Sequence, residues 1–172
     1  MITIDTKIRT FLDLIGWSEG TAISPITQNN GYDVLVTGIH GPAVFTDYSD
    51  HPFAHGGSVQ WKLNPPEFST AAGRYQILAH YFEAYKIQLN LPDFSPASQD
   101  AVAVQQISER NAIHLIEQGN ISAAITACSN IWASFPGNDY GQGGHSLNGL
   151  VAKYNADLAA ATAAAAAPIA TT

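Results

Sequence analysis

The feature that most constrains the fold is an apolar stripe near the N-terminus that ends on a carboxylate. Apolar residues recur there at helical spacing, at Ile8, Phe11, Leu12 and Ile15. This spacing predicts an amphipathic helix from about Asp5 to Ser18, with Thr3 or Asp5 as its cap. Glu19 comes four residues after Ile15, so the same spacing places its carboxyl group on the apolar stripe in the last helical turn.

That position favours a protonated carboxyl group. Burial and the negative end of the helix dipole both disfavour the charged form, so we expect a raised pKa for Glu19. A carboxylic acid that stays protonated near neutral pH is what a general acid requires. The alternative is an ordinary helix-ending glutamate that points into water, and the spacing alone leaves it open.

Composition and charge narrow the class of protein. The chain has 172 residues, of which 46% are hydrophobic and 12% charged, enough for one domain with a core. The formal net charge of −7 argues against a nucleic-acid partner. No apolar run reaches the length of a membrane span, and the N-terminus lacks the features of a secretory signal. We therefore expect a protein that is made in the cytoplasm and is not inserted in a membrane.

The cysteine and histidine residues do not predict a metal centre. Cys128 is the single cysteine, which excludes an intramolecular disulfide and a zinc site of thiolate type. Its apolar surroundings indicate a core position. His51 and His55 are four residues apart, but Pro52 and the glycines that follow disfavour a helix that would bring them together. We expect neither a metal nor a cofactor.

The order of the patterns predicts an α+β fold with a small antiparallel sheet before a helical part. Short strands are expected at residues 32–37, 44–46 and 58–63. Pro65 and Pro66 are expected to break the chain, and helices are expected from residue 69 or 70 onward. Later helices are expected to begin at Pro96 and after Ser146. Between them, one helix is expected to run to Glu117 and another from Ile121 to about Ala133.

Together these elements predict two lobes with a cleft between them and Glu19 at the boundary. The expected domain covers residues 1–158. Residues 159–172 are nearly all alanine and threonine and have no packing face, so we expect this tail to be frayed or disordered.

Seven motifs follow one another along most of the chain. They are Trp17-Ser-Glu-Gly20, Gly31-Tyr-Asp-Val34, Phe45-Thr-Asp-Tyr-Ser-Asp-His-Pro52, Gly73-Arg-Tyr-Gln76, the run from Asp93 to Asp100, the run from Ser129 to Ser134, and Pro136-Gly with Tyr140-Gly-Gln142. In this order, over roughly residues 8–155, they resemble the lambda-type endolysin family. Members of that family have a lysozyme-like fold and are peptidoglycan lytic transglycosylases.

The resemblance implies a mechanism that needs one carboxyl group. Glu19, in the Trp-Ser-Glu-Gly motif, would protonate the glycosidic oxygen between N-acetylmuramic acid and N-acetylglucosamine. As a carboxylate it would then take the proton of the muramoyl C6 hydroxyl, which attacks C1 and closes a 1,6-anhydro ring. The implied partner is a peptidoglycan glycan strand, and the implied state is a monomer that reaches the periplasm after release from the host cytoplasm.

Ten further residues are candidate substrate contacts: Tyr32, Asp33, Tyr48, Ser49, His51, Arg74, Tyr75, Gln76, Tyr140 and Gln142. Asp33 is either a second carboxylate of the site or a turn-capping residue. Tyr75 is alternatively a core residue, and Arg74 meets either a substrate carboxylate or a structural partner. The turn Gly73–Gln76 is expected to begin a helix, whose free N–H groups would face the substrate.

Two other functions remain open at this point. A hydrolytic muramidase would need a second carboxylate, Asp33 or Asp47, to act on water. A non-catalytic wall-binding or virion structural module would keep the shape without the chemistry. The chain also has only 7 Lys and Arg residues, which weakens long-range attraction to an anionic wall.

Overall fold

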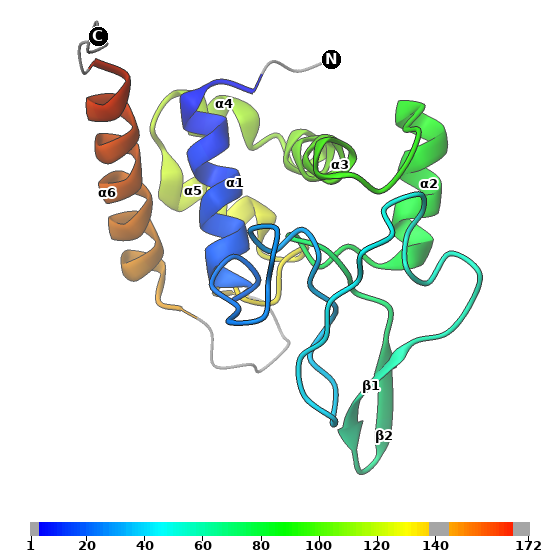
Figure 1. Cartoon of the computed structure of the whole chain (residues 1–172). Helices are drawn as coiled ribbons and strands as arrows, with labels where there is room; N and C mark the ends of the chain where they lie inside the picture. Colours follow the sequence, from blue (N-terminus) through cyan, green and yellow to red (C-terminus); the bar gives the residue numbers. More distant parts are fainter. Residues whose placement is uncertain (1–3, 138–144, 167–172) are drawn as a thin grey trace, which may run out of the picture. The chain divides into compact units, whose positions relative to one another are not determined.

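The computed structural model describes residues 4–137 and 145–166, and the chain divides into two compact units (Figure 1). The first unit consists of Met1–Ser18 and Ile107–Thr172, and the second of Glu19–Gln106. The boundary at residues 106 and 107 falls inside helix α3 (Pro96–Glu109). The mixture of helices with one small antiparallel sheet confirms the predicted α+β class.

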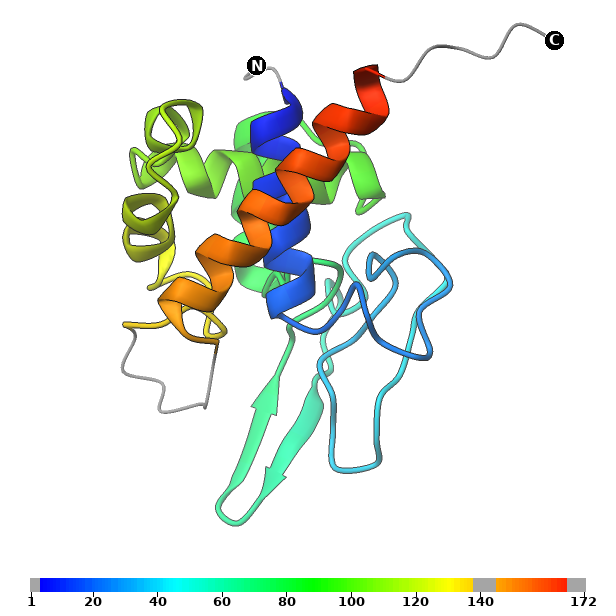
Figure 2. The ribbon, with the colours of Figure 1, turned by 90° about the vertical axis from the view of Figure 1, so that its left-hand side faces the viewer.

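The first unit is helical. It contains α1 (Thr6–Ser18), α4 (Ile113–Glu117), α5 (Ile121–Cys128) and α6 (Leu147–Ala166). Helix α1 packs against α6 and α4, and the contact with α6 is visible from two directions (Figures 1 and 2). The predicted first helix is confirmed, and its cap is Asp5, whose Oδ1 accepts the N–H of Ile8 at 2.9 Å.

The apolar stripe of α1 forms the centre of this unit. Phe11 is fully buried and meets the rings of Phe135 and Tyr154 edge-on, at centroid distances of 6.0 and 6.3 Å. Cys128 is buried, as expected for a core residue, and burial raises its pKa to about 12. Its thiol is therefore protonated at neutral pH.

The alanine-rich tail differs from its prediction. Helix α6 continues through Ala166, so residues 159–166 are helical, and residues 167–172 lie outside the described part. Alanine has the highest helix propensity, and a helix already nucleated by buried Leu150 and Tyr154 extends through it at little cost. None of the helices in the described ranges has the length and apolar character that a membrane span requires.

The second unit holds the sheet, a single antiparallel hairpin of β1 (Val59–Leu63) and β2 (Pro66–Ser69) (Figure 1). The predicted strand at 58–63 is confirmed. The expected break falls at Pro65, which lies in the hairpin turn, whereas Pro66 begins β2, a strand that the sequence patterns did not predict. Proline is tolerated there because it begins the strand, where a missing N–H costs little.

The other two predicted strands are wrong. Residues 32–37 and 44–46 form only isolated bridges, Val34 with Val44 and Leu35 with Ala72. Branched and aromatic residues indicate a half-buried extended surface, not a partner strand, and here the neighbouring segments are loops.

Helix α2, in the second unit, begins later than predicted. Helix α2 spans Ala79–Leu89, not a run from residue 69 or 70, because residues 72–77 form a bridged turn. The N-terminus of α3 at Pro96 is confirmed, since proline suits the first helical position. In the first unit, α5 ends at Cys128 and not near residue 133.

Candidate active site

Glu19 lies in the turn that directly follows α1. The helix ends at Ser18, as predicted, so Glu19 is just outside the last helical turn in which it was expected. Its side chain is half-buried. Glu19 is the first residue of the second unit, and the other described candidates belong to the same unit.

Two candidate residues bind a buried carboxylate. The Tyr32 and Tyr75 hydroxyls both donate to Oδ1 of Asp100, at 2.8 and 2.6 Å. Their rings meet edge-on with centroids 6.1 Å apart. Burial is the main reason that the pKa of each phenol is raised, so both stay protonated donors at neutral pH.

Asp33 has the structural role that the sequence left open. It is 4% exposed, and its Oδ2 accepts the N–H of Gln28 at 2.7 Å. Its Oδ1 accepts the hydroxyl of Thr27. Both carboxylate oxygens therefore hold the loop before Gly31, which is the turn-capping alternative.

Arg74 is 2% exposed, and its side chain binds a backbone carbonyl group. Its guanidinium donates to the carbonyl oxygen of Asn30 and lies 5.3 Å from the centre of the Tyr32 ring. The backbone N–H of Arg74 donates to Oε1 of Gln99 at 2.9 Å. Of the two roles left open for Arg74, the structure favours a structural partner.

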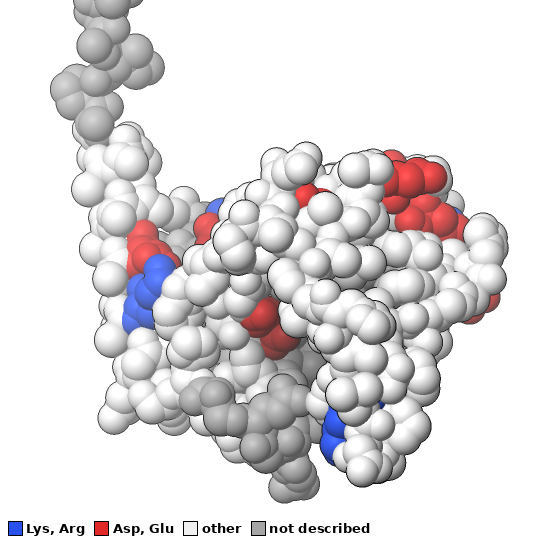
Figure 3. Space-filling model, turned by 60° about the horizontal axis from the view of Figure 1, so that its bottom comes forward, with Lys and Arg blue, Asp and Glu red and all other residues white. Residues whose placement is uncertain are grey.

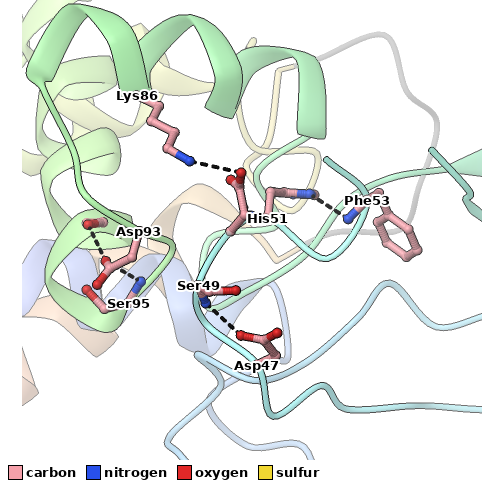
Figure 4. A network of polar contacts seen from close by, with 9 residues as sticks. Asp47, Ser49, His51, Phe53, Lys86, Asp93 and Ser95 are labelled. Atoms are coloured by element: carbon pink, nitrogen blue, oxygen red, sulfur yellow. Dashed lines mark hydrogen bonds and ion pairs between the residues drawn. The ribbon is translucent and has the colours of Figure 1, made fainter. Parts of the chain in front are cut away.

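The loop 47–53 is fixed by its own polar groups and by groups from other segments, among them Lys86 of α2 (Figure 4). The N–H of Ser49 donates to Oδ1 of Asp47 at 2.8 Å, and this bond lowers the pKa of Asp47. Lys86 of α2 forms an ion pair with Asp50 at 2.9 Å. Tyr48 is half-buried and its hydroxyl accepts the Asn29 amide at 2.9 Å, while Ser49 is exposed. The loop therefore offers Tyr48 and Ser49 at the surface.

His51 is buried within that loop and uses both ring nitrogens. Its Nε2 is 2.9 Å from the carbonyl oxygen of Ile77, which requires the proton on Nε2. Its Nδ1 then accepts the N–H of Phe53 at 3.2 Å (Figure 4). Burial lowers the pKa of His51, although the bond to Ile77 and nearby Asp50 oppose that shift.

The turn Gly73–Gln76 does not begin a helix, contrary to the prediction. It is closed by the bridge between Ala72 and Ile77, and Gln76 has a positive φ of 49°. The amide of Gln76 donates to the carbonyl oxygen of Gly73 at 3.0 Å, and its side chain is half-buried. Gln76 therefore belongs to a tight turn that leaves part of its amide accessible.

The candidates thus fall into three groups. Those with accessible side chains are Glu19, Tyr48, Ser49 and Gln76. Five candidates are buried and bind the protein's own backbone and side chains, so they are not placed to contact sugar directly. They are Tyr32, Asp33, His51, Arg74 and Tyr75. Tyr140 and Gln142 lie outside the described residues.

Sequence reasoning missed Gln99 and Asp100, which hold this network together. The Gln99 side chain is fully buried, and its Nε2 donates to the carbonyl oxygens of Tyr32 and Phe94, each at 3.0 Å. One signal was present: Gln99 is three and four residues before Val102 and Ala103, on the buried face of α3. A polar residue on such a face requires internal partners.

Comparisons with known proteins identify the class that this fold and these residues define. The fold is that of a phage lysozyme: bacteriophage lambda lysozyme complexed with a chitohexasaccharide matches with a TM-score of 0.82 and 51% identity, over 91% of this chain and 97% of that one. The endolysin family matches residues 9–161, and the chain belongs to that family of peptidoglycan-degrading phage enzymes.

Two relatives support the same assignment. The endolysin of Escherichia phage P2 is 54% identical over 152 residues, 88% of this chain and 92% of that protein. The endolysin of Escherichia phage lambda is 51% identical over 155 residues, 90% of this chain and 92% of that protein. The resemblance inferred from the seven motifs is therefore confirmed.

Proposed function

We propose that this endolysin cleaves the β-1,4 bond between N-acetylmuramic acid and N-acetylglucosamine by lytic transglycosylation. Glu19 gives its proton to the glycosidic oxygen as the bond from C1 to that oxygen breaks. The C6 hydroxyl oxygen of the muramoyl residue bonds to C1, and its proton passes to the Glu19 carboxylate. The product ends in a 1,6-anhydro ring, water is not consumed, and Glu19 is returned to its starting state.

The state of Glu19 and Asp33 carries this proposal. Glu19 is half-buried and accessible, whereas both oxygens of Asp33 are occupied inside the unit. A hydrolytic muramidase needs a second carboxylate to act on water or on C1. Intramolecular attack needs none, because the substrate supplies its own nucleophile at high effective molarity.

We further propose a glycan strand as the substrate, bound through accessible polar and aromatic groups. Tyr48, Ser49 and Gln76 supply such groups, and Tyr140 and Gln142 stay predicted contacts. The chitohexasaccharide named with lambda lysozyme supports a sugar polymer as the ligand. We also propose that the strand binds in the predicted cleft and that the protein is a monomer. It would be released from the host cytoplasm and act in the periplasm.

The test is analysis of the products with a matched pair of variants. Purified peptidoglycan glycan strands are digested, and the fragments are analysed by mass spectrometry. We expect fragments that end in 1,6-anhydro-muramic acid. Glu19→Gln should lower the rate by about 100-fold to 10,000-fold, the usual contribution of a general acid. Glu83→Gln, on the exposed face of α2, is the control and should keep the parent rate.

Each alternative has its own outcome. Fragments ending in reducing muramic acid would show a hydrolytic muramidase. No fragments from the parent protein, with binding to the wall retained, would show a non-catalytic module. A Glu19→Gln protein as active as the parent would refute the role of Glu19.

A further inference from the structure

The chain segment that leaves Glu19 is anchored two residues later. Thr21 is 3% exposed, and its hydroxyl donates to the carbonyl oxygen of Arg74 at 2.6 Å. Arg74 is part of the turn Gly73–Gln76. This hydrogen bond therefore ties the loop that carries Glu19 to the turn that carries Gln76.

Two other contacts join the same segments of the chain to the segment around Asn30 and Gly31. The Arg74 guanidinium donates to the carbonyl oxygen of Asn30. The next residue, Gly31, lies against the peptide between Thr21 and Ala22, where an added Cβ would stand 2.8 Å from the Ala22 nitrogen. Because only glycine fits this approach, the segments around residues 21, 30 and 74 hold one another in place.

Arg74, which accepts the Thr21 hydrogen bond, is itself held by a residue of α3. The N–H of Arg74 donates to Gln99, whose amide also bonds the carbonyl oxygens of Tyr32 and Phe94. Gln99 is fully buried, so it has little freedom to move. The bond from Thr21 therefore reaches a rigid point and not a flexible loop.

We propose that Thr21 is a positioning residue. Its hydroxyl bond to the carbonyl oxygen of Arg74 holds the Glu19 carboxyl group in a fixed position relative to the turn Gly73–Gln76. The inference rests on the proposed role of Glu19. Thr21 itself does not touch substrate. A displacement of a catalytic group by about 1 Å lowers a rate by about 100-fold, so loss of the anchor is expected to affect the chemical step.

The experiment replaces only the hydroxyl. Thr21→Val has nearly the same shape but cannot donate, and Thr21→Ser restores the donor. Thr10→Val is the matched control, since Thr10 is also 3% exposed and its hydroxyl bonds Thr6 within α1. Release of anhydro-ended fragments from soluble glycan strands is measured at several substrate concentrations, below the melting temperature of every variant.

We expect Thr21→Val to lower kcat by about 10- to 100-fold with KM changed less than about threefold. Thr21→Ser should recover most of kcat, and Thr10→Val should keep it. A purely structural role for Thr21 would lower melting temperature in both valine variants and leave kcat of the folded protein unchanged. Should Thr21→Val not fold, Thr21→Cys retains a weak donor, and its kcat should fall between those of the serine variant and Glu19→Gln.

The outcomes separate the two proposals. Parent-like kcat in folded Thr21→Val, or in Thr21→Cys where the valine variant does not fold, overturns the positioning role while an inactive Glu19→Gln upholds the proposed function. A fully active Glu19→Gln overturns both.

Discussion

Single residues inside the second unit show how a buried polar group specifies structure. Asp100 accepts both the Tyr32 and Tyr75 hydroxyls, and Gln99 binds three backbone groups. Leaving any of these groups unpaired would cost about 1–3 kcal/mol, so alternative packings of the same side chains are disfavoured. Glu19, the accessible candidate acid, therefore belongs to a unit whose buried polar groups are held in place by hydrogen bonds.

His51 gives a pH-dependent prediction at this scale. Burial lowers the pKa of His51, so the unfolded chain binds a proton more readily than the folded one. The free energy of unfolding should therefore fall as the pH drops below about 6.5, until the pH passes the lower folded-state pKa. Urea unfolding at pH 7.5, 6.5 and 5.5 measures this loss.

The matched variants for this prediction are His51→Gln and His114→Gln. We expect His51→Gln to be less stable at every pH but to lose less stability on acidification. His114 is exposed on α4, so its variant should follow the parent. An unchanged dependence on pH in His51→Gln would contradict the assignment.

At the scale of elements, the turn Gly73–Gln76 and helix α3 interlock. Gly73 has a φ of +77°, and an added Cβ would stand 2.1 Å from Oε1 of Gln99. The end of a glutamine side chain ordinarily moves aside, but this one is fully buried and hydrogen-bonded on both its oxygen and its nitrogen. The turn and the helix therefore leave no space for any side chain at position 73.

Gly73→Ala tests this interlock against Gly119→Ala. Gly119 has nearly the same φ, +78°, with nothing within 4 Å of an added Cβ. We expect Gly119→Ala to cost about 1–2 kcal/mol for backbone conformation alone. Gly73→Ala should cost about 1–3 kcal/mol more, because Gln99 must move. Urea unfolding of both variants gives the difference, and equal costs would show that Gln99 yields freely.

At the scale of the whole molecule, charge is scarce and its balance is negative. Most of the face seen in Figure 3 is neither acidic nor basic. The formal net charge is −7, with 7 Lys and Arg against 14 Asp and Glu. A negative protein is repelled by an anionic wall at long range, and salt screens that repulsion.

Lysis should therefore become faster as salt is added at low ionic strength. Between about 10 and 150 mM the Debye length falls from about 30 Å to about 8 Å, which removes most long-range repulsion. The measurement is the initial turbidity loss of permeabilised Gram-negative cells at fixed enzyme concentration. Binding of uncharged chitohexasaccharide is the control and should not change with salt. Lysis that slows steadily with salt would show that local attraction dominates instead.

Much of the helical architecture followed from sequence patterns. The stripe from Ile8 to Ile15, the cap at Asp5 and Pro96 at a first helical position each act within a few residues. Such local signals predicted α1 and α3 closely. The same patterns predicted strands at 32–37 and 44–46 wrongly, since strand pairing depends on segments elsewhere in the chain.

What the sequence determined by itself was the family, the α+β class and Glu19 as the candidate acid, because motifs and helical spacing are local properties. Tertiary structure alone decided which partners the inward-facing polar residues bind. Thr21 binds a residue 53 positions away, and Tyr32 binds Asp100 across 68 positions. Hydrogen bonds over such separations depend on how the whole unit packs, so no spacing in the sequence predicts them.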